Sequence, residues 1–129
     1  MSREKTAEFL VDCLTHIPPQ RGEVKVIVDT AIYGLKMIAQ GGEWSESEAL
    51  AAWASNRSTW AADEAEWAAY WAAHWAAYWV ASCVASFSAQ DRVAKWAADW
   101  AARAHQDRAA ERARQARVRE KLGLNTKGA

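Results

Sequence analysis

Aromatic side chains recur every four residues in one stretch of this chain, which reads WAAYWAAHWAAYWVAS from Trp67 to Ser82. Because an α-helix turns once every ~3.6 residues, this spacing predicts a slowly wrapping stripe on one helix face. Trp and Tyr are common binding hot spots and can stack on nucleobases. The same large rings alternating with small Ala could instead interlock as a helical core. The candidate binding residues of the stripe are Trp67, Tyr70, Trp71, His74, Trp75, Tyr78 and Trp79.

The histidines and cysteines form no catalytic set. His16 and His105 are far from His74 in sequence, and no HExxH-like spacing is present. Cys13 and Cys83 have neither metal-ligand spacing nor a disulfide framework, which indicates a reducing cytoplasm. We interpret His74 as a hydrogen-bonded residue among the rings. The expectation is a protein that is not an enzyme and needs no metal or cofactor.

A second candidate site is the basic segment near the C-terminus. Residues 103–121 contain seven Arg or Lys side chains, and we take Arg112 and Arg114 as candidate partner-binding residues. Such a segment could contact nucleic-acid phosphates. However, the chain has 16 basic and 16 acidic residues, so it generates no overall positive field. Nucleic acid is therefore not the expected partner, and this end could instead meet the acidic segment 43–66 of a second copy in a homo-oligomer.

The elements that must position these side chains are predicted to be helices. Apolar residues recur at helical intervals over 6–16 and 23–39, and Pro18-Pro19 and Gly41-Gly42 are natural stops. A short helix follows to about Ala54, and a long Trp/Ala-rich helix is expected over 58–86 with Ser58 as its cap. A last helix is expected over 89–122, with its basic end projecting from the domain.

These elements predict an all-α fold, a single bundle of about five helices around the long central helix. The domain would cover residues 1–122, followed by a disordered tail over 123–129. The pattern of Trp residues continues beyond the central repeat, because Trp96 and Trp100 are also four residues apart.

The uncharged stretch 67–90 is long enough to span a bilayer. Its Trp and Tyr residues recur through the middle, whereas membrane helices concentrate them at the two interfaces. The N-terminus MSREKTAEF also lacks the apolar run of a secretion signal. We therefore expect no membrane association and a cytoplasmic location.

The chain resembles the alanine-rich, all-helical immunity proteins of the Imm5-like group, which are found near bacterial polymorphic toxins and in phage genomes. The resemblance covers residues 8–104: a short Cys-bearing helix at 9–17, a helix ending in Gly41-Gly42-Glu43, a short helix with Ala49 to Ala52, and long Ala/aromatic tetrads. This chain has Trp where such proteins more often show Ala or Tyr.

What the resemblance implies is a compact helical protein that neutralises something by binding it; the resemblance names no target. We expect the partner to be a protein toxin or effector that is neutralised by occlusion. One alternative is a phage or bacterial counter-defence sponge that sequesters a small nucleotide signal in a Trp-lined pocket. A second alternative is nucleic-acid binding through the Arg-rich C-terminal helix.

Overall fold

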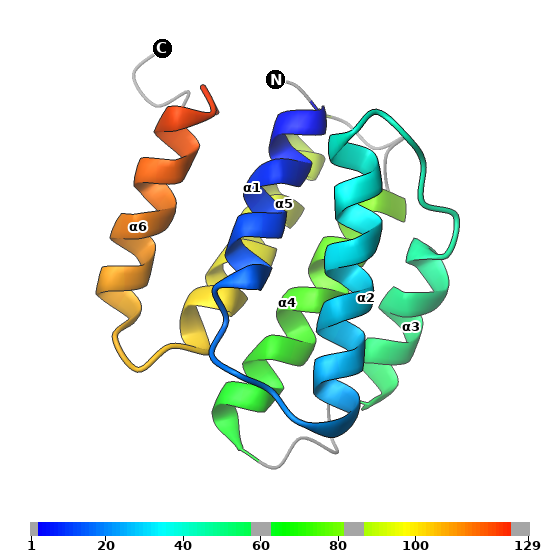
Figure 1. Cartoon of the computed structure of the whole chain (residues 1–129), viewed down its shortest axis with the longest axis vertical. Helices are drawn as coiled ribbons and strands as arrows, with labels where there is room; N and C mark the ends of the chain where they lie inside the picture. Colours follow the sequence, from blue (N-terminus) through cyan, green and yellow to red (C-terminus); the bar gives the residue numbers. More distant parts are fainter. Residues whose placement is uncertain (1–2, 58–62, 82–86, 125–129) are drawn as a thin grey trace.

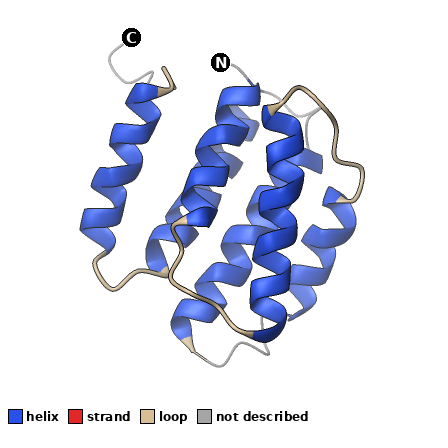
Figure 2. Ribbon diagram, in the orientation of Figure 1, coloured by secondary structure: helices blue, strands red, loops and turns tan. Residues whose placement is uncertain are grey.

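The computed structural model describes residues 3–57, 63–81 and 87–124, and the regular elements in these ranges are all α-helices (Figures 1 and 2). This confirms the predicted all-α bundle, with six helices in place of about five. The helices are α1 (Arg3–Thr15), α2 (Gly22–Ala39), α3 (Ser47–Arg57), α4 (Glu64–Ala81), α5 (Phe87–Arg103) and α6 (Arg108–Lys121).

The ends of α1 and α2 lie close to the predicted stops. His16 and Ile17 separate the end of α1 at Thr15 from Pro18-Pro19. At the end of α2, Gly41 has φ +86, a left-handed conformation that favours glycine. The amides of Gly41 and Gly42 donate back to the carbonyls of Ile38 and Met37, each at 2.9 Å. These bonds close the last turn of α2 in the manner of a glycine C-cap.

The prediction of one helix over 89–122 is wrong. Helix α5 ends at Arg103, and α6 begins at Arg108 after a short turn. The Asp107 side chain accepts a hydrogen bond from the Ala110 amide at 3.0 Å and caps α6. This cap satisfies a first-turn amide that would otherwise have no helical acceptor, so it stabilises a helix start at this point.

Helix α4 is the predicted Trp/Ala-rich central helix, but it starts later than expected. Asp63 is not helical, and its carboxylate accepts a hydrogen bond from the Glu66 amide at 2.8 Å as a local cap. The predicted cap Ser58 and the predicted end at residue 86 lie outside the described residues. The four-residue repeat therefore begins within the first turns of the described helix.

The helices form two layers, with α1 and α2 in front of α3, α4 and α5 in the view of Figure 1. Helix α4 lies between α3 and α5 and also contacts both helices of the front layer. Helix α6 stands at the edge, beside α1 and α5. The central position of α4 is thus confirmed, and its sides differ in what covers them.

The core side of α4 is lined with alanine. Ala69, Ala72, Ala73 and Ala76 are completely buried, as are large aliphatic residues of α1 and α2 such as Leu10, Ile27 and Leu35. Small side chains on one helix allow large ones on its neighbours to interdigitate at interior packing density. The interior of the bundle is therefore built mainly from alanines of α4 and α5 and aliphatic side chains of α1 and α2, together with four buried aromatic residues: Phe9, Trp44, Tyr70 and Trp79.

The Trp44 side chain packs directly against the backbone of α2 at Gly34. A Cβ atom added to Gly34 would lie 2.0 Å from Cδ2 of the buried Trp44 ring. The indole therefore lies directly against the α2 backbone, and only glycine leaves room for it.

The C-terminal part of the described chain is docked rather than projecting. Glu111 and Gln115 of α6 are buried, which corrects the expectation that this end extends away from the domain. Leu124 is also buried, two residues beyond the predicted domain boundary, whereas residues 125–129 of the predicted tail lie outside the described residues. Within the described ranges, no helix has the length and apolarity that crossing a membrane requires.

Candidate functional site

Seven rings form a continuous cluster on the side of α4 opposite its alanines, and we call this cluster the aromatic face. Helical geometry puts the alanines at 69, 73 and 76 roughly half a turn from the rings of α4, so burial of one set leaves the other facing outward. Helix α5 completes the cluster from the side. The aromatic face consists of Trp67, Trp71, His74, Trp75, Tyr78, Trp96 and Trp100.

Indole contacts join α4 to α5 across the aromatic face. The Trp67 and Trp100 ring centroids are 5.0 Å apart with an interplanar angle of 87°, and Trp75 meets Trp96 at 5.0 Å and 63°. Trp71 is stacked on Trp100 at 6.1 Å and 30°. Such aromatic pairs each contribute about 0.5–1.5 kcal/mol beyond the area they bury. The face therefore helps to hold α4 and α5 together.

The rings are nevertheless accessible. The exposed fractions are 39 % for Trp67, 44 % for Tyr78 and 44 % for Trp96, while Trp71, Trp75 and Trp100 are half-buried. Clustered exposed rings of this kind often mark interaction sites on soluble proteins. The stripe is therefore neither an enclosed core nor a set of isolated surface rings.

His74 lies in the middle of the aromatic face and is held by α3. Its Nδ1 atom is 2.6 Å from the Ala51 carbonyl oxygen, which can only accept, so Nδ1 carries the hydrogen. Burial lowers the pKa of His74 below its ordinary value, and the hydrogen bond to Ala51 opposes this shift to a smaller extent. The ring is therefore neutral at pH 7, and Nε2 is left as an acceptor.

Two further polar groups belong to the face. The Nε1 atom of Trp71 is buried and has no hydrogen-bond partner among the described residues. At the α5 end, the guanidinium of Arg103 lies 4.4 Å from the centroid of the Trp100 ring, a cation–π contact. The face thus combines aromatic rings with an imidazole acceptor and one flanking cation.

Two predicted site residues of the stripe are not part of the face. Tyr70 and Trp79 are turned into the bundle and are only 2 % and 4 % exposed. Conversely, Trp96, Trp100 and Arg103 were not among the predicted site residues. The sequence did contain a sign of the two indoles, since Trp96 and Trp100 repeat the four-residue spacing. This spacing alone could not predict that α5 packs against α4.

The predicted basic residues are on a different helix. Arg112 is exposed on α6, whereas Arg114 is half-buried and paired with Asp12 and Glu111. Helix α6 packs on α1 and α5, so these two residues do not join the aromatic face. Of the two, only Arg112 is accessible to a partner.

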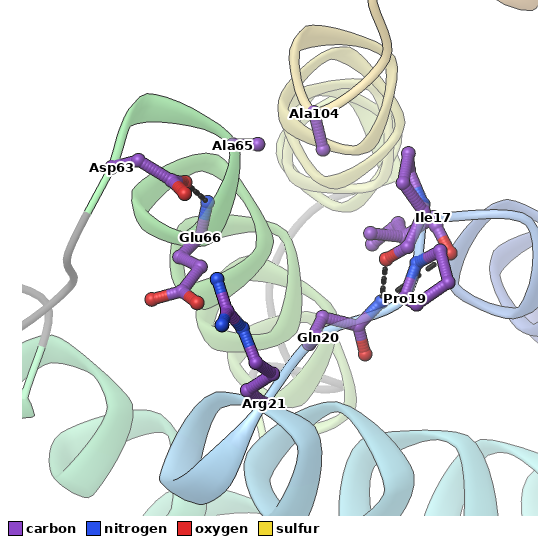
Figure 3. A pocket seen from close by; sticks show the side chains of 9 residues that line it. Ile17, Pro19, Gln20, Arg21, Asp63, Ala65, Glu66 and Ala104 are labelled. Atoms are coloured by element: carbon purple, nitrogen blue, oxygen red, sulfur yellow. Dashed lines mark hydrogen bonds between the residues drawn. The ribbon is translucent and has the colours of Figure 1, made fainter.

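A shallow polar pocket of about 70 Å³ lies between the α1–α2 connection and the start of α4 (Figure 3). Gln20 is fixed there because its Nε2 donates to the carbonyls of Ile17 and Pro18. Arg21 extends toward the Glu66 carboxylate across the pocket. None of the sequence-predicted site residues lines this pocket.

Neither a metal cluster nor a reactive cysteine is found among the described residues. They contain no group of three or more His, Cys, Asp or Glu side chains that could hold a metal ion. Cys13 is fully buried, and burial raises the pKa of its thiol well above the ordinary value, so it stays protonated. The chemistry that this arrangement can perform is recognition through rings and hydrogen bonds.

Fold and site together define an all-α bundle with an accessible aromatic face. Comparison with protein-family models found no match, and searches of the curated proteins and of the solved structures also found no similar chain.

Proposed function

We propose that this chain is a non-enzymatic binding protein that captures a protein partner on its aromatic face. One observation carries the proposal: the outer side of the α4–α5 layer is a contiguous cluster of seven rings, of which Trp67, Tyr78 and Trp96 are 39–44 % exposed. Trp, Tyr and Arg are the residues most enriched among binding hot spots. Arg103 beside Trp100 adds a cation to this apolar surface.

The arrangement of the rings favours a protein surface over a small planar ligand. Trp67, Trp75 and His74 each meet neighbouring rings edge to face, at centroid distances of 4.8–6.2 Å. Each ring therefore packs against at least one other ring, and together they present a continuous surface. Rigid aromatic side chains lose little entropy on binding, which suits a macromolecular interface.

The resemblance to immunity proteins supports the same kind of function. An immunity protein acts by binding and occluding a toxin or effector, which requires an exposed, preorganised surface and no catalytic residues. We propose this mode of action for the aromatic face. A small nucleotide, the sponge alternative, would have to use the same rings.

Nucleic-acid binding by α6 is not favoured, because much of its positive charge is used within the chain. Arg114 pairs with Asp12 and Glu111, Arg108 pairs with Glu64, and the Arg119 guanidinium lies over the Phe9 ring. The arginines that remain on the outer side of α6 are Arg112 and Arg117.

Native mass spectrometry of the tagged protein, purified gently from its own host, tests the proposal. The wild type should carry an added protein mass, and Trp96→Ala should lose it because this ring is 44 % exposed on the α5 side of the aromatic face. Trp67→Ala should weaken the complex in the same way. Circular dichroism at matched temperature should show both variants folded.

Tyr33→Ala is the matched control, since Tyr33 is an aromatic residue with 66 % exposure on α2, in the other layer. It should retain the partner. Equal retention by Trp96→Ala and Tyr33→Ala would contradict the aromatic face as the binding site. If the added mass is that of a small molecule, the result would contradict the protein-partner proposal and support the nucleotide alternative. If the chain carries no added mass, the result would contradict both.

A further inference from the structure

Helix α6 is attached to the bundle through polar side chains. Its buried residues are Glu111 and Gln115, each 5 % exposed. The Gln115 amide Nε2 donates to the Ala98 carbonyl of α5 at 3.1 Å and to Glu111 Oε2 at 3.2 Å. A helix that packs on a core usually buries an apolar stripe. In α6 the centre of the contact surface is a carboxylate and an amide.

Arg114 links this polar pair to α1. Its Nε and Nη2 atoms donate to the two carboxylate oxygens of Glu111 at 2.8 and 2.7 Å, and Nη1 donates to Asp12 Oδ2 at 2.5 Å. Burial would raise the pKa of Glu111, but the hydrogen bonds and charge of Arg114 outweigh it and hold that pKa below its ordinary value. The bidentate Arg114–Glu111 pair lies within α6 and orients the Arg114 side chain. The ion pairs that join α6 to the rest of the chain are Arg114 with Asp12 of α1 and, at the exposed start of the helix, Arg108 with Glu64 of α4.

The apolar part of the α6 contact is small. Val118 and Leu122 are partly buried against the core, and Leu124 is buried just beyond the helix. The alanines of α6 at positions 109, 110, 113 and 116 are exposed, whereas those on the inner side of α4 are fully buried. Docking of α6 therefore removes little apolar surface from water compared with the packing of α4.

Helix α6 also carries its own start and stop. The Asp107 carboxylate caps its first turn, and Gly123 at φ +73 allows the Leu124 amide to donate to the Arg119 carbonyl at 2.8 Å. The turn between α5 and α6 separates the two hydrogen-bond ladders. Movement of α6 therefore does not require α5 to unwind.

We propose that α6 is a releasable strap, which undocks from α1 and α5 as one unit while the α1–α5 bundle stays folded. Local units with few buried apolar contacts open at lower free energy than the core that supports them. Undocking would uncover the Phe9 ring, which the Arg119 guanidinium overlies at 5.4 Å, and would leave the Asp12 carboxylate without Arg114. This inference does not depend on the aromatic face having a partner.

Hydrogen–deuterium exchange of the intact chain at increasing urea tests the strap. The denaturant dependence of exchange reports the surface exposed in the opening reaction. Amides of α6 should show a much weaker urea dependence than amides of Ala69 to Ala76 in α4, which should exchange only on global unfolding. An identical dependence for α6 and α4 would overturn the proposal. Unprotected α6 amides at zero urea would also overturn it, because the docked state would then not be populated.

A matched pair of substitutions on α6 sharpens the test. Arg114→Gln removes the link between Glu111 and Asp12 and should speed exchange of α6 amides about tenfold, with α4 exchange unchanged. Arg112→Gln removes a charge from the exposed side of the same helix and should leave both rates unchanged. Equal effects of the two variants on α6, or equal acceleration of α6 and α4 by Arg114→Gln, would show that α6 is an integral part of the core. The urea series on the wild type decides the matter even if Arg114→Gln does not fold.

Discussion

At the scale of single residues, a repeat of four does not keep every ring on one side of a helix. Each step advances the ring by ~40°, so Trp79 stands ~120° from Trp67. This drift turns Trp79 into the bundle while Trp67 remains exposed. Tyr70 is likewise offset from the stripe and buried. The sequence therefore predicted the helix and most of the ring cluster. Which rings belong to the aromatic face depends on where α3 and α5 pack, and the sequence did not predict that.

Because His74 is partly buried, the free energy of unfolding should depend on pH below about 6.5. Its pKa in the folded chain lies below the ordinary value of 6.5, mainly because burial disfavours the charged ring. Below about pH 6.5 the unfolded chain therefore takes up a proton more readily than the folded chain. The free energy of unfolding should fall as the pH drops from 6.5 toward the folded pKa, by at most ~1.4 kcal/mol per pH unit from this group. Urea denaturation between pH 5 and 8 measures the effect.

His74→Gln provides the control, because the Gln amide can still donate to the Ala51 carbonyl without titrating. The difference in unfolding free energy between wild type and variant should narrow as the pH falls below 6.5. A difference that stays constant from pH 8 to pH 5 would show that His74 titrates normally in the folded chain.

At the scale of elements, the sequence predicted the helix ends that are marked by proline or glycine, because these residues restrict or free the backbone directly. Pro18-Pro19 and Gly41-Gly42 lie where α1 and α2 stop. The break between α5 and α6 has no such signal, because residues 104–107 contain neither glycine nor proline. His, Gln and Asp are all tolerated in a helix at a modest free-energy difference. Asp107 caps the start of α6, but an Asp is a weaker signal for a helix boundary than glycine or proline, so the break became evident only in the structure.

The Asp107 cap should contribute measurably to α6. Asp107→Ala removes the acceptor for the Ala110 amide and should cost about 1 kcal/mol of helix stability. Exchange of α6 amides should then be about fivefold faster by hydrogen–deuterium exchange. Gln106→Ala, an exposed substitution in the same turn, should leave the rate unchanged. Indistinguishable rates for the two variants would mean that Asp107 does not stabilise the start of α6.

At the scale of the whole molecule, two layers decide which side of α4 is interior. Helical spacing puts alanines such as Ala69 and Ala73 roughly opposite the Trp stripe, but the sequence left open whether the stripe was core or a binding surface. Because α1 and α2 cover the alanine side, the rings are left on the outer side of the back layer. Periodicity identifies two apolar faces and cannot say which one a neighbouring layer covers.

Enlarging the alanine side of α4 should destabilise the bundle. Ala73→Leu forces a large side chain into a completely buried position and should lower the free energy of unfolding by about 1–3 kcal/mol. Urea denaturation at pH 7 measures the change. Ala81→Leu places the same side chain at an exposed position of the same helix and should change stability by less than ~0.5 kcal/mol. Equal stabilities for the two variants would show that the α4 alanines do not set the spacing of the layers.

The alanine interior of α4 also affects the entropy of folding. An alanine side chain has no rotamers to lose, so placing Ala69, Ala72, Ala73 and Ala76 in the core costs almost no side-chain conformational entropy. The indoles of the aromatic face, which have rotamers to restrict, lie outside the alanine interior and contact one another on the outer side. A flexible binding surface loses side-chain entropy when it meets its target. Here part of that loss has already occurred when the chain folds.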